Sequence, residues 1–168
     1  MIKNRKRVIT LLIYIILIAI IFVADQFTKE WIRNNVEIGE KIQIISDNVL
    51  ITHVENDGIA FGMKFPGIQY LSYIAFFAVL WLLISHIRKE KPLISNYFAF
   101  SLIIAGAIGN LIDRFIHDSV TDMIMIGIKG HYWPIFNVAD SAVTVGVIIF
   151  LIASYFDNRK EKIVEEEF

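Results

Sequence analysis

The stretch Phe136-Asn137-Val138-Ala139-Asp140 opens the last long apolar segment of the chain and constrains how the rest can fold. Asp140 lies about one helical turn inside a segment that is otherwise typical of a membrane span. A carboxylate at such a depth is costly, at roughly 2.5 kcal/mol or more at the bilayer centre and less toward the interface. Asp140 is therefore a candidate functional residue, and we expect a partner for it elsewhere in the chain.

The composition is that of a small integral membrane protein. Of the 168 residues, 56% are hydrophobic, and the mean hydropathy is +0.59. Soluble domains contain about 45–50% apolar residues. The chain has no cysteine, which excludes a disulfide framework and a cysteine nucleophile. No internal repeat or Gly/Ser-rich linker interrupts it, so we expect one membrane domain over residues 1–168.

Four apolar segments are long enough to cross a bilayer as helices, at about 8–27, 68–87, 93–112 and 137–156. About 20 residues at a rise of 1.5 Å cover the roughly 30 Å hydrocarbon core. The first segment follows a basic start, as in a signal peptide. It is longer than a signal-peptide core and no cleavage site follows, so we predict a retained helix. Residues 31–35 are predicted to be a short continuation of this helix that lies at the interface, a short interfacial helix.

Four spans place both termini on one side of the membrane. That side would hold ten of the sixteen Lys and Arg residues, and the positive-inside rule then makes it the cytoplasm. The ten residues are Lys3, Arg5, Lys6, Arg7, Arg88, Lys89, Lys91, Arg159, Lys160 and Lys162.

A small β-region is predicted on the opposite, extracytoplasmic side. Residues 41–45 and 49–54 are rich in β-branched side chains and flank the turn signal Ser46-Asp47-Asn48. Residues 113–134 are predicted to be a loop that returns to the membrane interface. The fold class is thus an all-α membrane protein with four transmembrane helices, an extracytoplasmic β-region and a short interfacial helix.

Polar groups near membrane depth converge on the extracytoplasmic surface in this topology. Some end the first and third spans, some begin the fourth, and two lie in the outer loops. Helices packed in a bundle would bring such groups together. They are Asp25, Asn56, Asn110, Asp113, Arg114, Asp122, Asn137 and Asp140.

Several of these residues have a structural alternative. Asn137 is a good helix N-cap, and Asp140 lies where a carboxylate favours the helix dipole. Asp113 and Arg114 are adjacent, so they are candidates for a structural ion pair at a helix end.

Further alternatives concern the first and third spans. Asp25 and Lys29 are i,i+4 neighbours that could anchor an interface. Gly106 and Gly109 favour close approach of two helices. Asp118 is interpreted as an ordinary exposed loop residue, which makes it a natural control for its acidic neighbours.

A pair of carboxylates is the chemistry that this composition favours. The four histidines are scattered without a zinc motif, and Ser141 lacks the context of a serine nucleophile. Two close carboxyls cannot both ionise easily, so one retains a proton while the other activates a water for attack on an amide. A small transporter or proton-relay protein is the alternative, because it also buries carboxylates in its spans.

Four motifs, in this order along the chain, closely resemble those of the bacterial lipoprotein signal peptidases, also called signal peptidase II. The resemblance covers essentially the whole chain apart from the basic start and the acidic tail. The motifs are Asp25-Gln26-x-Thr28-Lys29; Asn56-x-Gly58-x-Ala60-Phe61-Gly62; Gly106-Ala107-x-Gly109-Asn110-x-x-Asp113-Arg114 with Val120-x-Asp122; and Phe136-Asn137-x-Ala139-Asp140.

The resemblance implies an aspartic endopeptidase of the bacterial plasma membrane. Such enzymes remove the signal peptide from diacylglyceryl-modified prolipoproteins, just before the lipidated cysteine. It implies that Asp122 and Asp140 are the catalytic dyad on the extracytoplasmic side. The residues implied to position substrate or dyad, or to support the site, are Asn56, Gly58, Asn110, Arg114, Asn137, Asp25 and Asp113.

The same resemblance implies a β-cradle over residues 36–55 and inhibition by the cyclic peptide globomycin. We expect a monomer surrounded by membrane phospholipids, with no metal, no cofactor and no nucleic-acid partner.

Overall fold

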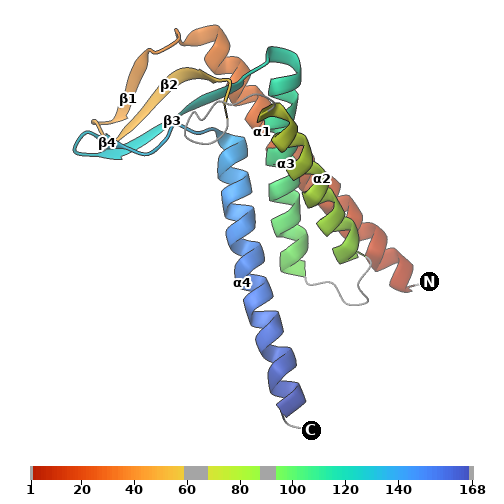
Figure 1. Ribbon diagram of the computed structural model, residues 1–168. Helices are drawn as coiled ribbons and strands as arrows, with labels where there is room; N and C mark the ends of the chain where they lie inside the picture. The colour runs from red at the N-terminus through yellow and green to blue at the C-terminus, as the bar shows by residue number, and fades with distance from the viewer. Residues whose placement is uncertain (1, 59–67, 88–93, 167–168) are drawn as a thin grey trace.

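The computed structural model describes residues 2–58, 68–87 and 94–166, and these form four long helices and one four-stranded sheet. Figure 1 shows the sheet at one end of the helices, while the start of α1 and the end of α4 lie at the other. In chain order the elements are α1 (Ile2–Asn35), β1 (Lys41–Ile45), β2 (Val49–Asn56), α2 (Ile68–Ile87), α3 (Ile94–His117), β3 (Val120–Ile128), β4 (His131–Tyr132) and α4 (Val138–Glu166).

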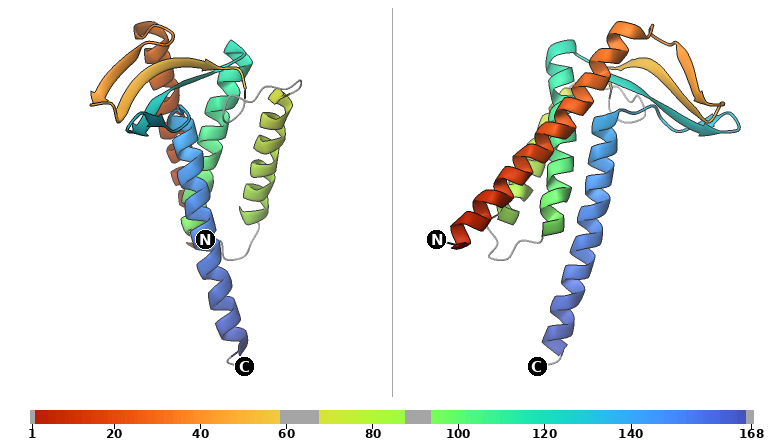
Figure 2. Two further views of the ribbon diagram at one scale, coloured as in Figure 1. Left: turned by 60° about the vertical axis from the view of Figure 1, so that its left-hand side comes forward. Right: turned by 180° about the vertical axis from the view of Figure 1, so that it is seen from behind.

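Helix α3 lies at the centre of the bundle and contacts α1, α2 and α4 (Figure 2). Tyr14 of α1 and Phe100 and Ile104 of α3 form a buried apolar cluster. The ring of Phe150 on α4 packs on Phe100, with ring centroids 5.2 Å apart. These contacts fix three helices against one another below the sheet.

Three helical segments are long and apolar enough to cross a membrane within the described part of the chain: Leu12–Asn35, Tyr97–His117 and Val138–Phe156. Helix α2 coincides with the segment predicted at 68–87, and its crossing of the membrane stays a prediction. The side of the membrane on which the sheet lies stays a prediction as well.

The third helix is longer than the predicted span at 93–112, since it continues to His117. Its added turn carries Asp113, which is fully buried because cations from α1 neutralise its carboxylate. The helix ends where Asp118 adopts a positive φ of 58° and its N–H bonds to the Arg114 carbonyl at 3.2 Å.

Residues 31–35 continue the first helix, as predicted, because α1 runs without a break to Asn35. Ile32 and Val36 are buried against Met123 of the sheet, so packing on the sheet extends the helix. Whether these last turns lie at a membrane interface stays a prediction.

The predicted hairpin is confirmed, with β1 and β2 antiparallel around residues 46–48. The loop predicted over 113–134 is wrong for Val120–Ile128, which forms β3 and pairs with β2 in the order β1-β2-β3-β4. Pairing with β2 makes this segment a strand. Lys129 and Gly130 both have positive φ and form the tight turn into β4.

Two glycines of α3 allow the close helix approach that the sequence predicted. A side chain at Gly106 would overlap the carbonyl oxygen of Ala139, at the start of α4. A side chain at Gly109 would overlap the carboxylate of Asp25 on α1. The glycines therefore bring three helix segments together at the sheet end of the bundle.

Replacement of Gly106 by leucine is expected to destabilise the fold, because α4 cannot move away without losing its contacts to α3. Overpacking of this kind costs about 1–3 kcal/mol. Thermal unfolding of the purified protein in detergent should show a lower Tm. Val147→Leu, an added methylene at an exposed position of α4, is the control and should leave the Tm nearly unchanged.

Candidate active site

The N-terminus of α4 is closed by a reciprocal cap. The Asn137 Oδ1 accepts the Asp140 N–H at 2.9 Å, and the Asp140 Oδ2 accepts the Asn137 N–H at 3.3 Å. This is the geometry of a capping box, so the N-cap interpretation of Asn137 is confirmed. The Ala139 N–H donates to Asp25 Oδ1 at 2.8 Å, which ties α4 to α1. The cap fixes the position of the Asp140 carboxylate.

Asn137 also links Asp140 to a second carboxylate. Its Nδ2 donates to Asp122 Oδ1 at 2.7 Å, while Asn56 Nδ2 donates to Asp122 Oδ2 at 2.9 Å. Asp122 lies on β3 and is only 3% exposed. One asparagine thus bonds to Asp122 through its side chain and to Asp140 through its backbone. The two carboxylates come from a strand and a helix start but share one donor residue.

Asn110 of α3 supplies the remaining contact to Asp140. Its Nδ2 donates to Asp140 Oδ1 at 2.7 Å. Its Oδ1 accepts from Lys29 Nζ at 2.8 Å and from Asn137 Nδ2 at 3.2 Å. Both oxygens of Asp140 therefore have donors.

A buried ion cluster lies behind these amides, between α1 and α3. Lys29 is fully buried and pairs with Asp25 at 2.8 Å and with Asp113 at 3.0 Å. Arg33 pairs with Asp113 at 3.1 Å. The predicted Asp113–Arg114 pair is wrong, because Asp113 points toward the α1 cations. Asp25 and Lys29 do form an i,i+4 pair, which is buried between α1 and α3. Its position at a membrane interface stays a prediction.

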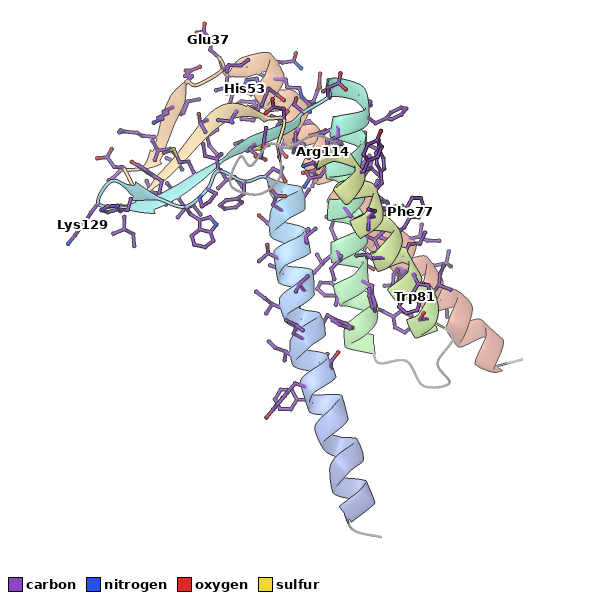
Figure 3. The ribbon with its side chains drawn as sticks, viewed as in Figure 1. Glu37, His53, Phe77, Trp81, Arg114 and Lys129 are labelled. Carbon is purple, nitrogen blue, oxygen red and sulfur yellow. The ribbon has the colours of Figure 1, made fainter. Side chains whose placement is uncertain are left out.

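Arg114 joins α3 to the end of β2 (Figure 3). Its guanidinium donates to the Gly58 carbonyl at 3.2 Å and to the Asn110 carbonyl at 3.3 Å. Asn56 Oδ1 accepts the Gly58 N–H at 3.0 Å, which shapes the turn after β2. The Arg114 charge interacts with both Asp122 and Asp140.

A cavity of about 690 Å³ opens beside the two carboxylates. Its polar lining comes from Asn56, Asn110, Arg114, Asp122, Asp140, Ser141 and Thr144, and its apolar lining comes mainly from α2, α3, α4 and the segment after β4. Trp133, predicted to lie at the membrane interface, is largely exposed and lines this cavity.

Burial raises the pKa of Asp122 to about 6, against an ordinary value of 3.8. The hydrogen bond from Asn56 opposes this rise, and the nearby Asp140 charge adds to it. Asn137 and Lys29 also favour the ionised form. Since the rise prevails, Asp122 retains a proton to higher pH than an exposed aspartate does.

The structure thus brings together the residues singled out from the sequence, with Asp122 and Asp140 at the cavity and Asp25 and Asp113 behind it. Ala60, Phe61 and Gly62 of the second motif lie outside the described residues.

Sequence reasoning missed the central position of Lys29, for which its i,i+4 spacing from Asp25 was the available signal. In the described part of the chain, no three His, Asp or Glu side chains cluster as a metal site.

A family model described as signal peptidase (SPase) II matches residues 17–156. A lipoprotein signal peptidase of Listeria welshimeri is 38% identical over 152 residues, which cover 89% of this chain and 96% of that protein. One from Staphylococcus carnosus is 40% identical over 144 residues, with 85% and 90% covered.

Two solved structures of bacterial membrane enzymes, determined by the in meso method, share the fold. The one at 2.3 Å resolution is 34% identical, with a TM-score of 0.77 and coverage of 86% of this chain and 88% of that one. The one at 1.9 Å is 35% identical, with a TM-score of 0.73 and coverage of 83% and 90%. The fold and these matches define a multi-pass membrane peptidase. The chain belongs to the signal peptidase II family.

Proposed function

We propose that this protein is an aspartic endopeptidase that removes the signal peptide from diacylglyceryl-modified prolipoproteins. The observation that carries the proposal is the meeting of Asp122 and Asp140 at one cavity, with Asn137 bonded to both. The carboxyls come from elements separated in the chain, and family membership supports peptide hydrolysis at this site.

In the proposed reaction, the dyad shares one proton. The ionised carboxylate takes a proton from a water molecule, whose oxygen attacks the scissile carbonyl carbon. The protonated carboxyl donates to the developing oxyanion. The proton taken from water then passes to the leaving amine as the C–N bond breaks.

The amide side chains would hold the dyad and the substrate backbone. Asn137 and Asn110 orient Asp140, while Asn56 orients Asp122. Arg114 holds the Gly58 carbonyl and adds positive charge near both carboxyls. Preorganised donors of this kind stabilise charge that develops in a transition state.

The cavity supports a lipidated substrate, because its walls are largely apolar away from the carboxyls. Phe76 and Val79 of α2 and Ile103 of α3 line it together with Val143 of α4. We propose that acyl chains lie along these helices, with cleavage on the N-terminal side of the lipidated cysteine. The site would face the extracytoplasmic side of the cell membrane, in a monomer surrounded by phospholipids. A globomycin-type cyclic peptide would compete for the same cavity.

Activity is expected to fall as the pH rises through about 6, because Asp122 then loses the proton that the reaction uses. Removal of a donor that favours the ionised form raises that pKa. Asn56→Ala should therefore move the alkaline limb of the kcat/KM profile to higher pH, while also lowering the rate. A profile measured from pH 4 to 9 checks this, and movement of the limb to lower pH would contradict it.

The decisive experiment is a mass measurement on a purified diacylglyceryl prolipoprotein incubated with this protein. Loss of the signal peptide immediately before the lipidated cysteine is the expected result. An unchanged precursor in the presence of folded protein would contradict the proposal. The transporter alternative predicts solute flux without cleavage in proteoliposomes, and family membership favours the peptidase.

A further inference from the structure

Lys29 is a buried charge for which the proposed reaction has no role. Its side chain is fully buried, whereas lysines rarely are unless they are paired. Two carboxylates neutralise it, Asp25 at 2.8 Å and Asp113 at 3.0 Å. These pairs alone would make it a structural residue between α1 and α3.

A third contact of Lys29 leads toward the site. An ammonium only donates, so the atom of Asn110 that faces Lys29 at 2.8 Å must be the amide oxygen. The other end of that amide is then the Nδ2, which lies 2.7 Å from Asp140 Oδ1. The reverse orientation would place the amide NH₂ against the ammonium and the amide oxygen against a carboxylate. Both contacts would be repulsive.

We infer that Lys29 is a positioning residue, which fixes the direction of the Asn110 amide and so keeps its NH₂ group on Asp140. The inference rests on the proposed function for its catalytic consequence, whereas the amide orientation is independent of it. The ammonium also polarises the amide, and a hydrogen bond is strengthened when its donor group is polarised in this way. Lys29 thereby holds the Asn110 NH₂ group on Asp140 without touching the cavity, since it is absent from the cavity lining.

The charges around the dyad set the expected pH response. Lys29 interacts electrostatically with both Asp122 and Asp140. The other charged groups that face this region are Arg114 on α3, Asp25 and Arg33 on α1, and Asp113 on α3. Because the Lys29 charge lowers the pKa of Asp122, its removal should move the alkaline limb of the kcat/KM profile to higher pH.

The test is Lys29→Gln, which keeps a polar side chain of similar length but removes the cation. We expect kcat to fall by about 10- to 100-fold with KM changed little, because the dyad is misplaced while the cavity wall is intact. The alkaline limb of the pH profile should move to higher pH by about one unit. A loss of folded protein with kcat and the profile of the remaining enzyme unchanged would show a merely structural role and overturn the inference.

Arg33→Gln is the matched control. Arg33 belongs to the same ion cluster through Asp113 but makes no contact with Asn110. We expect it to lower the Tm without moving the pH profile. A profile shift equal to that of Lys29→Gln would mean that general charge loss, and not the Asn110 contact, is responsible, and would also overturn the inference.

A measurement on the unsubstituted protein covers the case in which Lys29→Gln does not fold. With ¹⁵N-asparagine labelling in detergent micelles, the Asn110 NH₂ protons should show cross-relaxation to the Asp140 β-protons. Cross-relaxation to the Lys29 ε-methylene instead would overturn the inference. This readout needs no activity, so failure of the proposed function, seen as retained cleavage by dyad variants, is distinguishable from failure of this one.

Discussion

Asp122→Asn and Asp140→Asn should each abolish signal-peptide cleavage, with a loss on the order of 10³-fold or more. In the proposed mechanism each carboxyl has a separate task, one as base on water and one as proton donor, and an amide performs neither. The fold should persist, because an amide of nearly equal size retains an oxygen that accepts from Asn137 or Asn110. Initial rates on a purified lipidated precursor, with Tm measured in the same detergent, check both statements.

Asp118→Asn is the matched control, since the same chemical change falls on an exposed residue between α3 and β3. It should retain near-normal cleavage. Near-normal cleavage by either dyad variant would contradict the assignment of the pair.

Asp113→Ala is expected to give the largest loss of stability. It leaves Lys29 with one carboxylate partner and removes the carboxylate that pairs with the Arg33 Nη2. The Thr121 N–H and the Gln26 amide lose an acceptor as well. Breaking a buried pair by removing one partner costs about 3–5 kcal/mol. Thermal unfolding should show a marked drop in Tm, with little folded protein recovered.

Asp47→Ala is the control for this change. Asp47 is exposed in the β1–β2 turn and accepts one hydrogen bond from Gln43. Surface changes of this kind usually alter stability by no more than about 0.5 kcal/mol. Equal Tm values for the two variants would show that the buried cluster adds little to the stability of the fold.

The sequence pattern correctly predicted the elements whose structure depends on residues close together in the chain. The apolar run at 68–87 and the β-branched stretch at 41–45 have the predicted bounds, because apolar length and turn chemistry are local properties. The N-cap role of Asn137 is equally local, since both cap partners lie within four residues.

The errors concern residues whose state is decided by distant partners. Asp113 was interpreted as the charged residue beyond the end of a span, but Lys29, 84 positions earlier, allows it to be buried inside α3. β3 was missed because it is formed by pairing with β2, and it carries Asp122. The positions of the polar residues along the chain therefore predicted that they gather at one end of the helices. The choice of Asp122 as the partner of Asp140 depended on the family resemblance.

The reciprocal cap at the start of α4 bears on when the protein becomes competent during its synthesis. Asp122 is synthesised before α4, whereas Asn137, which donates a hydrogen bond to it, is the N-cap of α4. Until α4 has been synthesised and inserted, the Asp122 carboxylate lacks both its neighbour Asp140 and the hydrogen bond from Asn137. The order of the chain thus keeps the proposed catalytic pair from forming in the nascent protein until the last helix is in place.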